Sequence, residues 1–106
     1  MIILNAENYD YCVSHGKTVL YVWATWCAPC KFMSVYMQEI TDEISDSIVL
    51  MKCDADDEIC SKLMSKFDIK GVPTLLFFEK GKVVKQLSGG MTKDRIIKEI
   101  KDVWSE

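Results

Sequence analysis

Two cysteines, Cys27 and Cys30, are the residues of this chain best suited to chemistry. Thiols at this spacing can close into a small disulfide and open again. A strand-like apolar run, Val19 to Ala24, precedes them, and a helix-like run, Lys31 to Ile44, follows them. A thiolate at the start of a helix lies near unsatisfied N–H groups and the positive end of the helix dipole, which lower its pKa. The sequence therefore predicts a redox dithiol in which Cys27 is the more exposed, nucleophilic sulfur.

Cys30 is expected one turn inside the helix, close enough to attack the sulfur of Cys27 and release a bound substrate. A static structural disulfide or half of a zinc site are the alternatives. Tetrahedral zinc usually needs a second close pair of ligands, whereas Cys53 and Cys60 have six residues between them. A zinc site would have to be built from unrelated segments, so no metal is expected.

Size and composition favour one globular domain, residues 1–106, with 49% hydrophobic residues. A net charge of −3, a pI near 5.1 and the absence of a basic cluster argue against nucleic-acid binding. No apolar run approaches the roughly 20 residues that cross a bilayer, and Met1 is followed by no charged leader. An odd count of five cysteines fits a reducing compartment. We therefore expect a cytoplasmic monomer without a membrane partner.

The pattern of apolar residues predicts the elements that must position the two cysteines. Strands are expected at 2–4, 18–24, 48–53, 74–78 and 82–87, and helices from Asn5 to about residue 15, from residue 30 to 44, from about 58 to 67, and after Thr92. This β-α-β-α-β-α-β-β-α order predicts an α/β fold with a mixed five-stranded sheet and helices on both faces. The redox pair then lies at the C-terminal edge of the second strand.

Three segments resemble the thioredoxin family in their order and separation. They are Trp23 to Lys31 (WATWCAPCK), Gly71 to Thr74 (GVPT) and Gly89-Gly90. The resemblance covers essentially the whole chain and implies a thioredoxin fold. It also implies a general protein disulfide reductase that is recharged by thioredoxin reductase, acts on disulfide-bearing proteins and uses no cofactor beyond the Cys27–Cys30 disulfide.

The same resemblance implies roles for residues around the cysteines. In the family, a small residue followed by proline, here Ala28-Pro29, goes with reductases, whereas histidine in the second position goes with oxidases and isomerases. Pro73 resembles a cis-proline facing the sulfurs, which leaves the backbone of Val72 free to pair with an extended substrate. The expected substrate-binding residues are Trp26, Val72, Pro73, Gly89, Gly90 and Met91. The residues expected to support the cysteines are Tyr21, Trp26, Ala28, Pro29, Lys31 and Lys52.

Two positions depart from the family pattern. Thioredoxins usually carry a buried acid where this chain has Tyr21, and the lysine near that acid is matched by Lys52. Either the phenol of Tyr21, or a water beside it, takes over the proton relay, or Cys30 is deprotonated more slowly. Val35 replaces a helix-kinking proline, which predicts a straighter second helix.

The other three cysteines, Cys12, Cys53 and Cys60, are expected to be packed thiols, because free cysteine is among the most buried residue types. Cys60 is the best exception. It lies early in the third predicted helix, where it could be glutathionylated or could join two chains.

Two other functions compete with the reductase. The same fold could make the pair a disulfide oxidase or isomerase, which a measured reduction potential would distinguish. A binding module could use the Pro73 face with an incidental dithiol, although a pure binder need keep neither cysteine. Trapping of mixed disulfides after substitution of Cys30 separates a catalyst from a binder.

Overall fold

A mixed five-stranded sheet forms the centre of the fold in the computed structural model, which describes residues 1–14 and 16–105. Its strands follow the order β1-β3-β2-β4-β5. Their bounds are Ile2–Ile3 (β1), Lys17–Trp23 (β2), Ile48–Asp54 (β3), Thr74–Glu79 (β4) and Lys82–Ser88 (β5). β3 pairs in parallel with both β1 and β2, and β4 pairs antiparallel with both β2 and β5. The predicted fold class and element order are confirmed.

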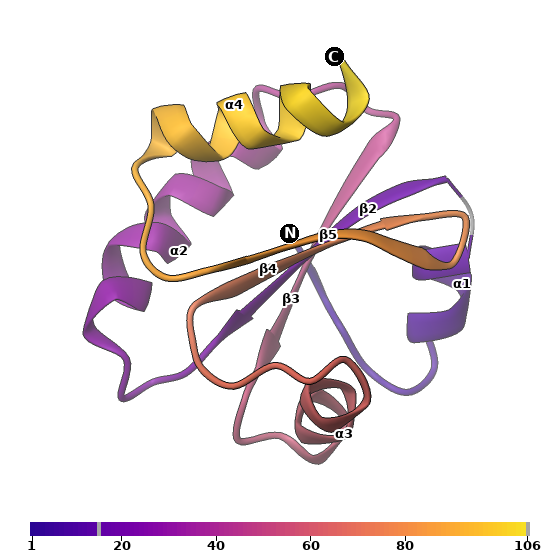
Figure 1. Ribbon diagram of the computed structural model, residues 1–106, viewed down its shortest axis with the longest axis vertical. Helices are drawn as coiled ribbons and strands as arrows, with labels where there is room; N and C mark the ends of the chain where they lie inside the picture. Colours follow the sequence, from indigo (N-terminus) through magenta and orange to yellow (C-terminus); the bar gives the residue numbers. More distant parts are fainter. Residues whose placement is uncertain (15, 106) are drawn as a thin grey trace.

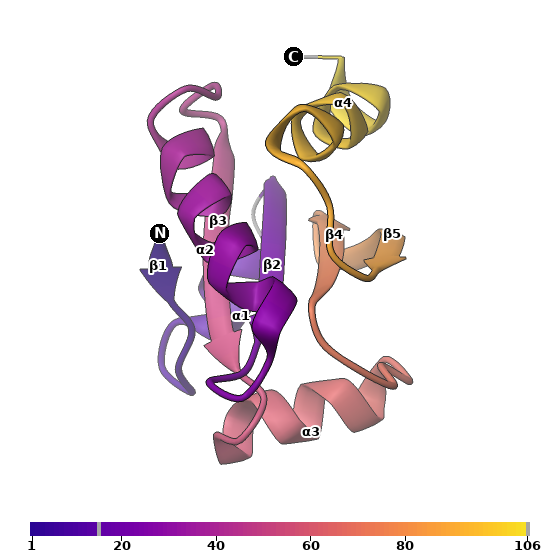
Figure 2. The same cartoon turned by 90° about the vertical axis from the view of Figure 1, so that its left-hand side faces the viewer.

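Four helices cover the two faces of this sheet (Figure 1). They are α1 (Tyr9–Ser14), α2 (Ala28–Thr41), α3 (Glu58–Lys66) and α4 (Lys93–Trp104). α2 and α4 pack on one face, and α1 and α3 pack on the other. Figure 2 shows α2 lying along β2 and β3, with α3 at the end of the sheet where β3 finishes.

The nearly continuous apolar run in β2 follows from burial on both faces. Successive side chains of a strand point to opposite sides. Val19 and Tyr21 therefore face the α2 and α4 side, while Leu20 and Val22 face the α1 and α3 side. β2 thus joins two separate hydrophobic cores, and the loop that follows it starts from a firmly held strand.

A tight turn joins β4 and β5 into an antiparallel hairpin. Lys80 and Gly81 both have positive φ, at 50° and 86°. A turn with positive φ at both central residues has a backbone twist that matches the right-handed twist of the flanking strands. Glycine adopts this conformation at little steric cost. The hairpin returns the chain beside β4, so that the loop after β5 reaches the end of the sheet that carries the cysteines.

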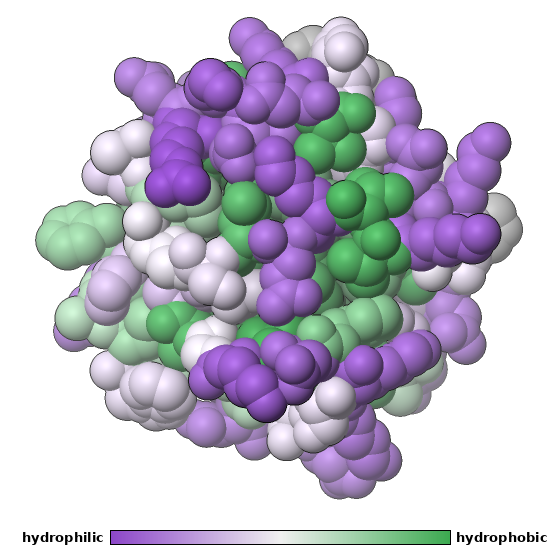
Figure 3. Space-filling model, viewed as in Figure 1, coloured by the Kyte–Doolittle hydropathy of each residue, from purple (hydrophilic) through white to green (hydrophobic). Residues whose placement is uncertain are grey.

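Helix α4 is held by a cap at its start and a buried stripe along its length. The Thr92 side chain accepts a hydrogen bond from the backbone N–H of Arg95 at 3.2 Å. Ile96, Ile100 and Trp104 recur every four residues and are buried against the sheet. Figure 3 shows hydrophilic side chains gathered over α4, with hydrophobic side chains in the middle of that face.

Replacing Thr92 with alanine is expected to lower the free energy of unfolding by about 1 kcal/mol, because the first turn of α4 loses a hydrogen-bond acceptor. Urea unfolding of both proteins measures the difference. Thr92→Ser keeps a capping oxygen and serves as the matched control. A loss of equal size in the serine variant would show that the threonine methyl group, rather than the cap, stabilises this turn.

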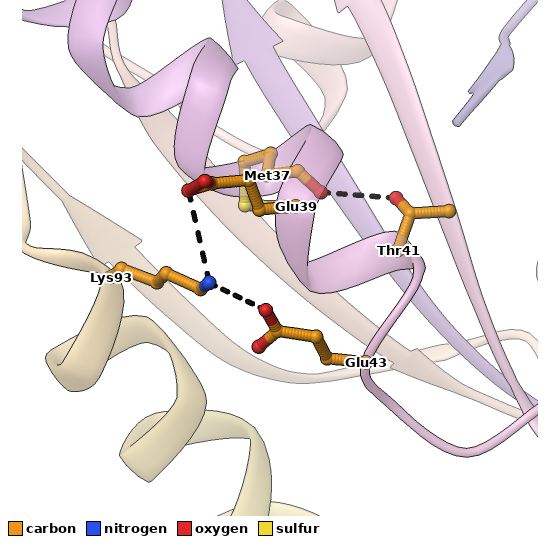
Figure 4. Close-up of polar contacts among 5 residues, drawn as sticks. All are labelled: Met37, Glu39, Thr41, Glu43 and Lys93. Atoms are coloured by element: carbon orange, nitrogen blue, oxygen red, sulfur yellow. Dashed lines mark hydrogen bonds and ion pairs between the residues drawn. The ribbon is translucent and has the colours of Figure 1, made fainter.

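A bridging lysine links α2 and α4 on the surface. The Nζ of Lys93 lies 2.6 Å from the Glu43 carboxylate and 3.7 Å from that of Glu39 (Figure 4). In the last turn of α2, the Thr41 hydroxyl donates to the carbonyl oxygen of Met37 at 3.0 Å. The ion pairs raise the pKa of Lys93, led by its hydrogen bond to Glu43. The three side chains are partly exposed, so salt weakens these ion pairs.

The start of α1 and the end of α2 differ most from the sequence prediction. The side chain of Asn5 accepts from the backbone N–H groups of Glu7 and Asn8, so it caps a turn, and α1 begins only at Tyr9. α2 ends at Thr41 instead of residue 44, because Asp42 caps it through backbone bonds to two preceding carbonyls. Both differences reflect local backbone hydrogen bonding that the spacing of apolar residues does not report.

Candidate active site

Cys27 occupies the N-cap of α2, directly after the loop that follows β2. Its backbone is extended, with φ −92° and ψ 110°. Its sulfur accepts a hydrogen bond from the backbone N–H of Cys30 at 3.3 Å. Pro29 lies in the first turn, where its missing N–H removes no helical bond. A sulfur at the N-cap lies close to unsatisfied backbone N–H groups and to the positive end of the helix dipole. Both stabilise its negatively charged thiolate form.

The two active-site sulfurs are joined as a disulfide in this structure. The Cα atoms of Cys27 and Cys30 lie 5.3 Å apart, within the usual range for a disulfide. Both residues are buried, at 5% exposure for Cys27 and 2% for Cys30. Together with Ala24 they form a small apolar cluster at the end of the sheet. Because both cysteines are buried, a substrate disulfide must dock closely to reach them.

Two other predicted segments meet the cysteines here. Val72 packs against the cluster that contains Cys27 and Cys30, and the Val72–Pro73 peptide bond is cis. The backbone N–H of Gly89 donates to the carbonyl of Pro73 at 2.9 Å. A Cβ atom on Gly90 would lie 3.2 Å from the Cβ of Pro29, so the absence of a side chain permits this close approach.

The surface around the pair is partly apolar and partly open. Trp26 is 68% exposed, and its indole Nε1 donates to the carboxylate of Asp56 at 3.1 Å. Ala28 and Gly90 are also exposed, while Pro73 and Met91 are buried. The indole is therefore held at the rim of the site by a partner from the loop between β3 and α3.

A pocket of about 270 Å³ continues this surface along α2. It is lined by Pro29, Phe32, Tyr36, Gly90, Met91 and Thr92. Phe32 is 69% exposed. Sequence reasoning missed Phe32 and Tyr36, although a signal was present. Phe32 lies on the exposed side of α2, where polar residues are the norm. Tyr36 is half-buried and packs against the core beside Met33 and Ile40.

Tyr21 lies beneath the first turns of α2 and is wholly buried. Its hydroxyl donates to the carbonyl oxygen of Cys30 at 3.1 Å and lies 2.9 Å from the hydroxyl of Ser34. A carbonyl only accepts and the phenol has one proton, so Ser34 must be the donor to Tyr21. Burial raises the pKa of Tyr21, while the Ser34 bond lowers it in part. The phenol is therefore neutral at physiological pH.

The two predicted lysines lie in different surroundings. The Nζ of Lys52 lies 5.9 Å from the centre of the Trp23 ring, a cation–π contact. Trp23 itself is half-buried. Lys31 is exposed and borders a pocket of about 200 Å³ that Cys30 and Ser34 also line. This pocket is a second hollow that reaches Cys30, and its lining contains none of the residues around Pro73 and Gly90.

The structure corrects the prediction for two of the remaining cysteines. Cys53 and Cys60 were expected to be packed free thiols, but they form a disulfide. Cys60 is wholly buried, which also removes the expectation that it is glutathionylated or joins two chains through an accessible thiol. The pairing was missed because one cysteine lies on a strand and the other on a helix. Cys12 is a free, half-buried thiol.

Within residues 1–14 and 16–105, no helix is both long and apolar enough to span a membrane. In the same part of the chain, no three side chains of His, Cys, Asp or Glu gather closely enough to hold a metal ion.

Comparisons with known proteins agree with one another. The sequence profile of the thioredoxin family matches residues 1–102. A thioredoxin from Alicyclobacillus acidocaldarius is 32% identical over 101 residues, which cover 94% of each chain. A bifunctional thioredoxin reductase/thioredoxin from Mycobacterium leprae is 29% identical over 95% of this chain and 22% of its own length. A solved structure of a mutant thioredoxin from Halobacterium salinarum has the same fold, with a TM-score of 0.84 and 22% sequence identity. The match covers 95% of this chain and 88% of that chain.

Proposed function

The chain belongs to the thioredoxin family and is a thiol–disulfide oxidoreductase; we propose that it works as a general protein disulfide reductase. The N-cap position of Cys27 makes its thiolate the attacking group, whereas the direction of the reaction is supported by Ala28-Pro29 between the two cysteines. In the family, a small residue followed by proline goes with reductases, while a strongly stabilised thiolate would make the pair more oxidising.

The proposed reaction moves two electrons in two exchanges. The Cys27 thiolate attacks one sulfur of a substrate disulfide, and the other substrate sulfur leaves as a thiolate that takes up a proton. The sulfur of Cys30 then loses its proton and attacks the sulfur of Cys27. The second substrate sulfur leaves as a thiolate and is protonated in turn. The substrate is reduced to a dithiol, and the Cys27–Cys30 disulfide closes.

The proposed substrate groove combines three segments around these sulfurs. An extended substrate strand would pair with the backbone of Val72, next to Pro73, which donates no competing N–H. The exposed indole of Trp26 and the loop of Gly89, Gly90 and Met91 would border the strand. Main-chain pairing on an apolar rim accounts for reduction of many proteins with little sequence preference.

Tyr21 supports Cys30 in this proposal by holding its backbone instead of accepting its proton. A neutral phenol with a raised pKa is a poor base, and its only proton already binds the Cys30 carbonyl. Of the two hypotheses for this departure, this geometry favours slower deprotonation of Cys30. Mixed disulfides are then expected to persist longer than in a protein with a buried acid here.

The proposal includes an electron donor and a setting. A thioredoxin reductase would return two electrons to the Cys27–Cys30 disulfide, and the Mycobacterium leprae relative carries both names in one chain. We propose that the protein works as a monomer in the cytoplasm, with no cofactor beyond its disulfide and with no nucleic-acid or membrane partner. Its composition and charge support the last two points.

The reduction potential of the Cys27–Cys30 pair tests the direction of the reaction. Equilibration against defined thiol buffers is expected to give a value near −270 mV, about that of thioredoxin. Pro29→His is the matched variant, and its potential is expected to be higher. A wild-type value above about −200 mV would contradict both the reductase function and the reducing compartment, and would indicate an oxidase or isomerase.

A further inference from the structure

The second disulfide, Cys53–Cys60, ties the end of β3 to the first turn of α3. The two Cα atoms lie 5.7 Å apart, within the range that a disulfide bridges without backbone movement. Cys53 is 3% exposed and Cys60 is wholly buried. The bond therefore lies inside the hydrophobic core on the α1 and α3 side of the sheet, while Cys27 and Cys30 belong to a separate cluster.

The segment that this disulfide closes borders the active site. Ala55 packs against the cluster of Cys27 and Cys30, and its backbone N–H donates to the carbonyl of Trp23 at 2.7 Å. Asp56 accepts the hydrogen bond from the indole of Trp26. The Asp54 carboxylate in turn accepts from the backbone N–H of Asp56 at 2.9 Å. One short loop thus carries both the second disulfide at its ends and the support of the active-site rim.

We propose that Cys53 and Cys60 are a second redox centre, whose state sets how firmly residues 54–57 are held beneath the active site. Oxidation converts the two thiols into one disulfide and a low-molecular-weight disulfide, such as glutathione disulfide, into two thiols. Two electrons pass to the oxidant, and the two cysteine protons end on its sulfurs. A dithiol reverses the reaction. The chain then carries four reducing equivalents in place of two.

The two centres differ in how easily another molecule reaches them. Both pairs are buried, but Cys27 belongs to a small cluster beside the exposed Trp26, whereas Cys53 and Cys60 lie within the larger core, where exchange requires β3 and α3 to separate locally. We therefore expect Cys53–Cys60 to react more slowly in both directions. This ordering allows a form of the protein with Cys27–Cys30 reduced and Cys53–Cys60 still oxidised.

The state of the second centre is expected to change work on protein substrates. Without the disulfide, the loop of residues 54–57 is freer, and Asp56 holds the Trp26 indole less firmly. A protein substrate needs the organised rim for docking, so its reduction is expected to slow a few-fold. A small disulfide needs only the sulfur of Cys27 and is expected to be reduced at an unchanged rate.

Counting thiols tests whether the centre exists. Protein oxidised with excess glutathione disulfide is quenched in acid, unfolded, alkylated and weighed by mass spectrometry. One free thiol is expected, from Cys12, and none in Cys12→Ala. Three free thiols would overturn the proposal. Stepwise reduction of wild-type protein is expected to release two thiols quickly and two more slowly, and release of all four in one phase would contradict the predicted order.

Kinetics test whether the second centre acts on the first. We compare insulin reduction by the half-reduced form, the fully reduced form and Cys60→Ala, with Cys12→Ala as the matched control. The fully reduced form and Cys60→Ala are expected to be slower on insulin and unchanged on a small aromatic disulfide. Equal rates in all forms would overturn the coupling. If Cys60→Ala does not fold, the comparison of the half-reduced and fully reduced wild type still tests the coupling.

Melting of the wild type gives an independent measurement. With Cys27–Cys30 oxidised in both samples, the form with the second disulfide is expected to melt on the order of 10 °C higher than the form without it, because the bond restricts the unfolded chain. Equal melting would contradict a disulfide between these residues. The proposal does not depend on the direction in which Cys27–Cys30 works, so an oxidising potential at that pair would leave the thiol count unaffected.

Discussion

Replacing Cys30 with serine is expected to stop turnover and leave substrate proteins covalently attached to Cys27. The first exchange needs only the thiolate at the N-cap of α2, while release needs the second sulfur, one turn further along the helix. A hydroxyl cannot take part in thiol–disulfide exchange. Incubation with oxidised protein extract, followed by non-reducing and then reducing gel electrophoresis, is expected to show many adducts that a dithiol removes.

Two controls decide the meaning of this result. Cys27→Ser, which lacks the attacking sulfur, is expected to form no adducts and to reduce no insulin. Cys12→Ser removes a thiol outside both pairs and is expected to behave as the wild type. Absence of adducts from the Cys30 variant, with folding confirmed by circular dichroism, would favour a binding module in which the dithiol is incidental.

Replacing Tyr21 with aspartate is expected to accelerate the second exchange by about 10²-fold, the lower end of what a well-placed general base contributes. The side chain at this position lies directly beneath Cys30, and a carboxylate there can accept the cysteine proton, which the neutral phenol cannot. Burial raises the pKa of a carboxyl group at this site, and only its ionised form is a base. The acceleration is therefore expected to appear as pH rises through that pKa and to vanish below it.

Stopped-flow measurement of substrate release from a preformed mixed disulfide, between pH 5 and about pH 9, tests this expectation. Tyr21→Phe keeps the ring, loses the bonds to Cys30 and Ser34, and is expected to change the rate only a few-fold. A large loss in the phenylalanine variant would show that the phenol, or a water beside it, relays the proton. Unchanged kinetics in the aspartate variant across pH would rule out both hypotheses.

The sequence was sufficient to predict the elements and their order. The spacing of apolar residues distinguishes a strand buried on both faces, such as β2, from an amphipathic helix, such as α2. Helix ends were less predictable. They depend on which backbone groups a side chain such as Asn5 satisfies, and several neighbouring positions are similar in energy.

Contacts within one short segment of the site could be predicted from the sequence. Contacts between segments that are distant in the chain were harder to predict. Cys27 and Cys30 share a helix turn, so their proximity follows from spacing alone. Cys53 and Cys60 are seven positions apart, and their proximity depends on the angle between β3 and α3, which spacing does not give. The Ser34 hydroxyl beneath Cys30 depends in the same way on the docking of α2 against β2.

The shortest strand has a consequence for how the protein opens. β1 contributes two residues, and its pairing with β3 joins segments almost fifty positions apart in the chain. So small an edge strand detaches at low energetic cost, and its loss frees the outer edge of β3 while β2 still holds the inner edge. In hydrogen–deuterium exchange, the β3 amides that face β1 are expected to exchange well before those that face β2. A freed parallel edge of this kind is also where a second chain would add a strand, so aggregation is expected to begin there.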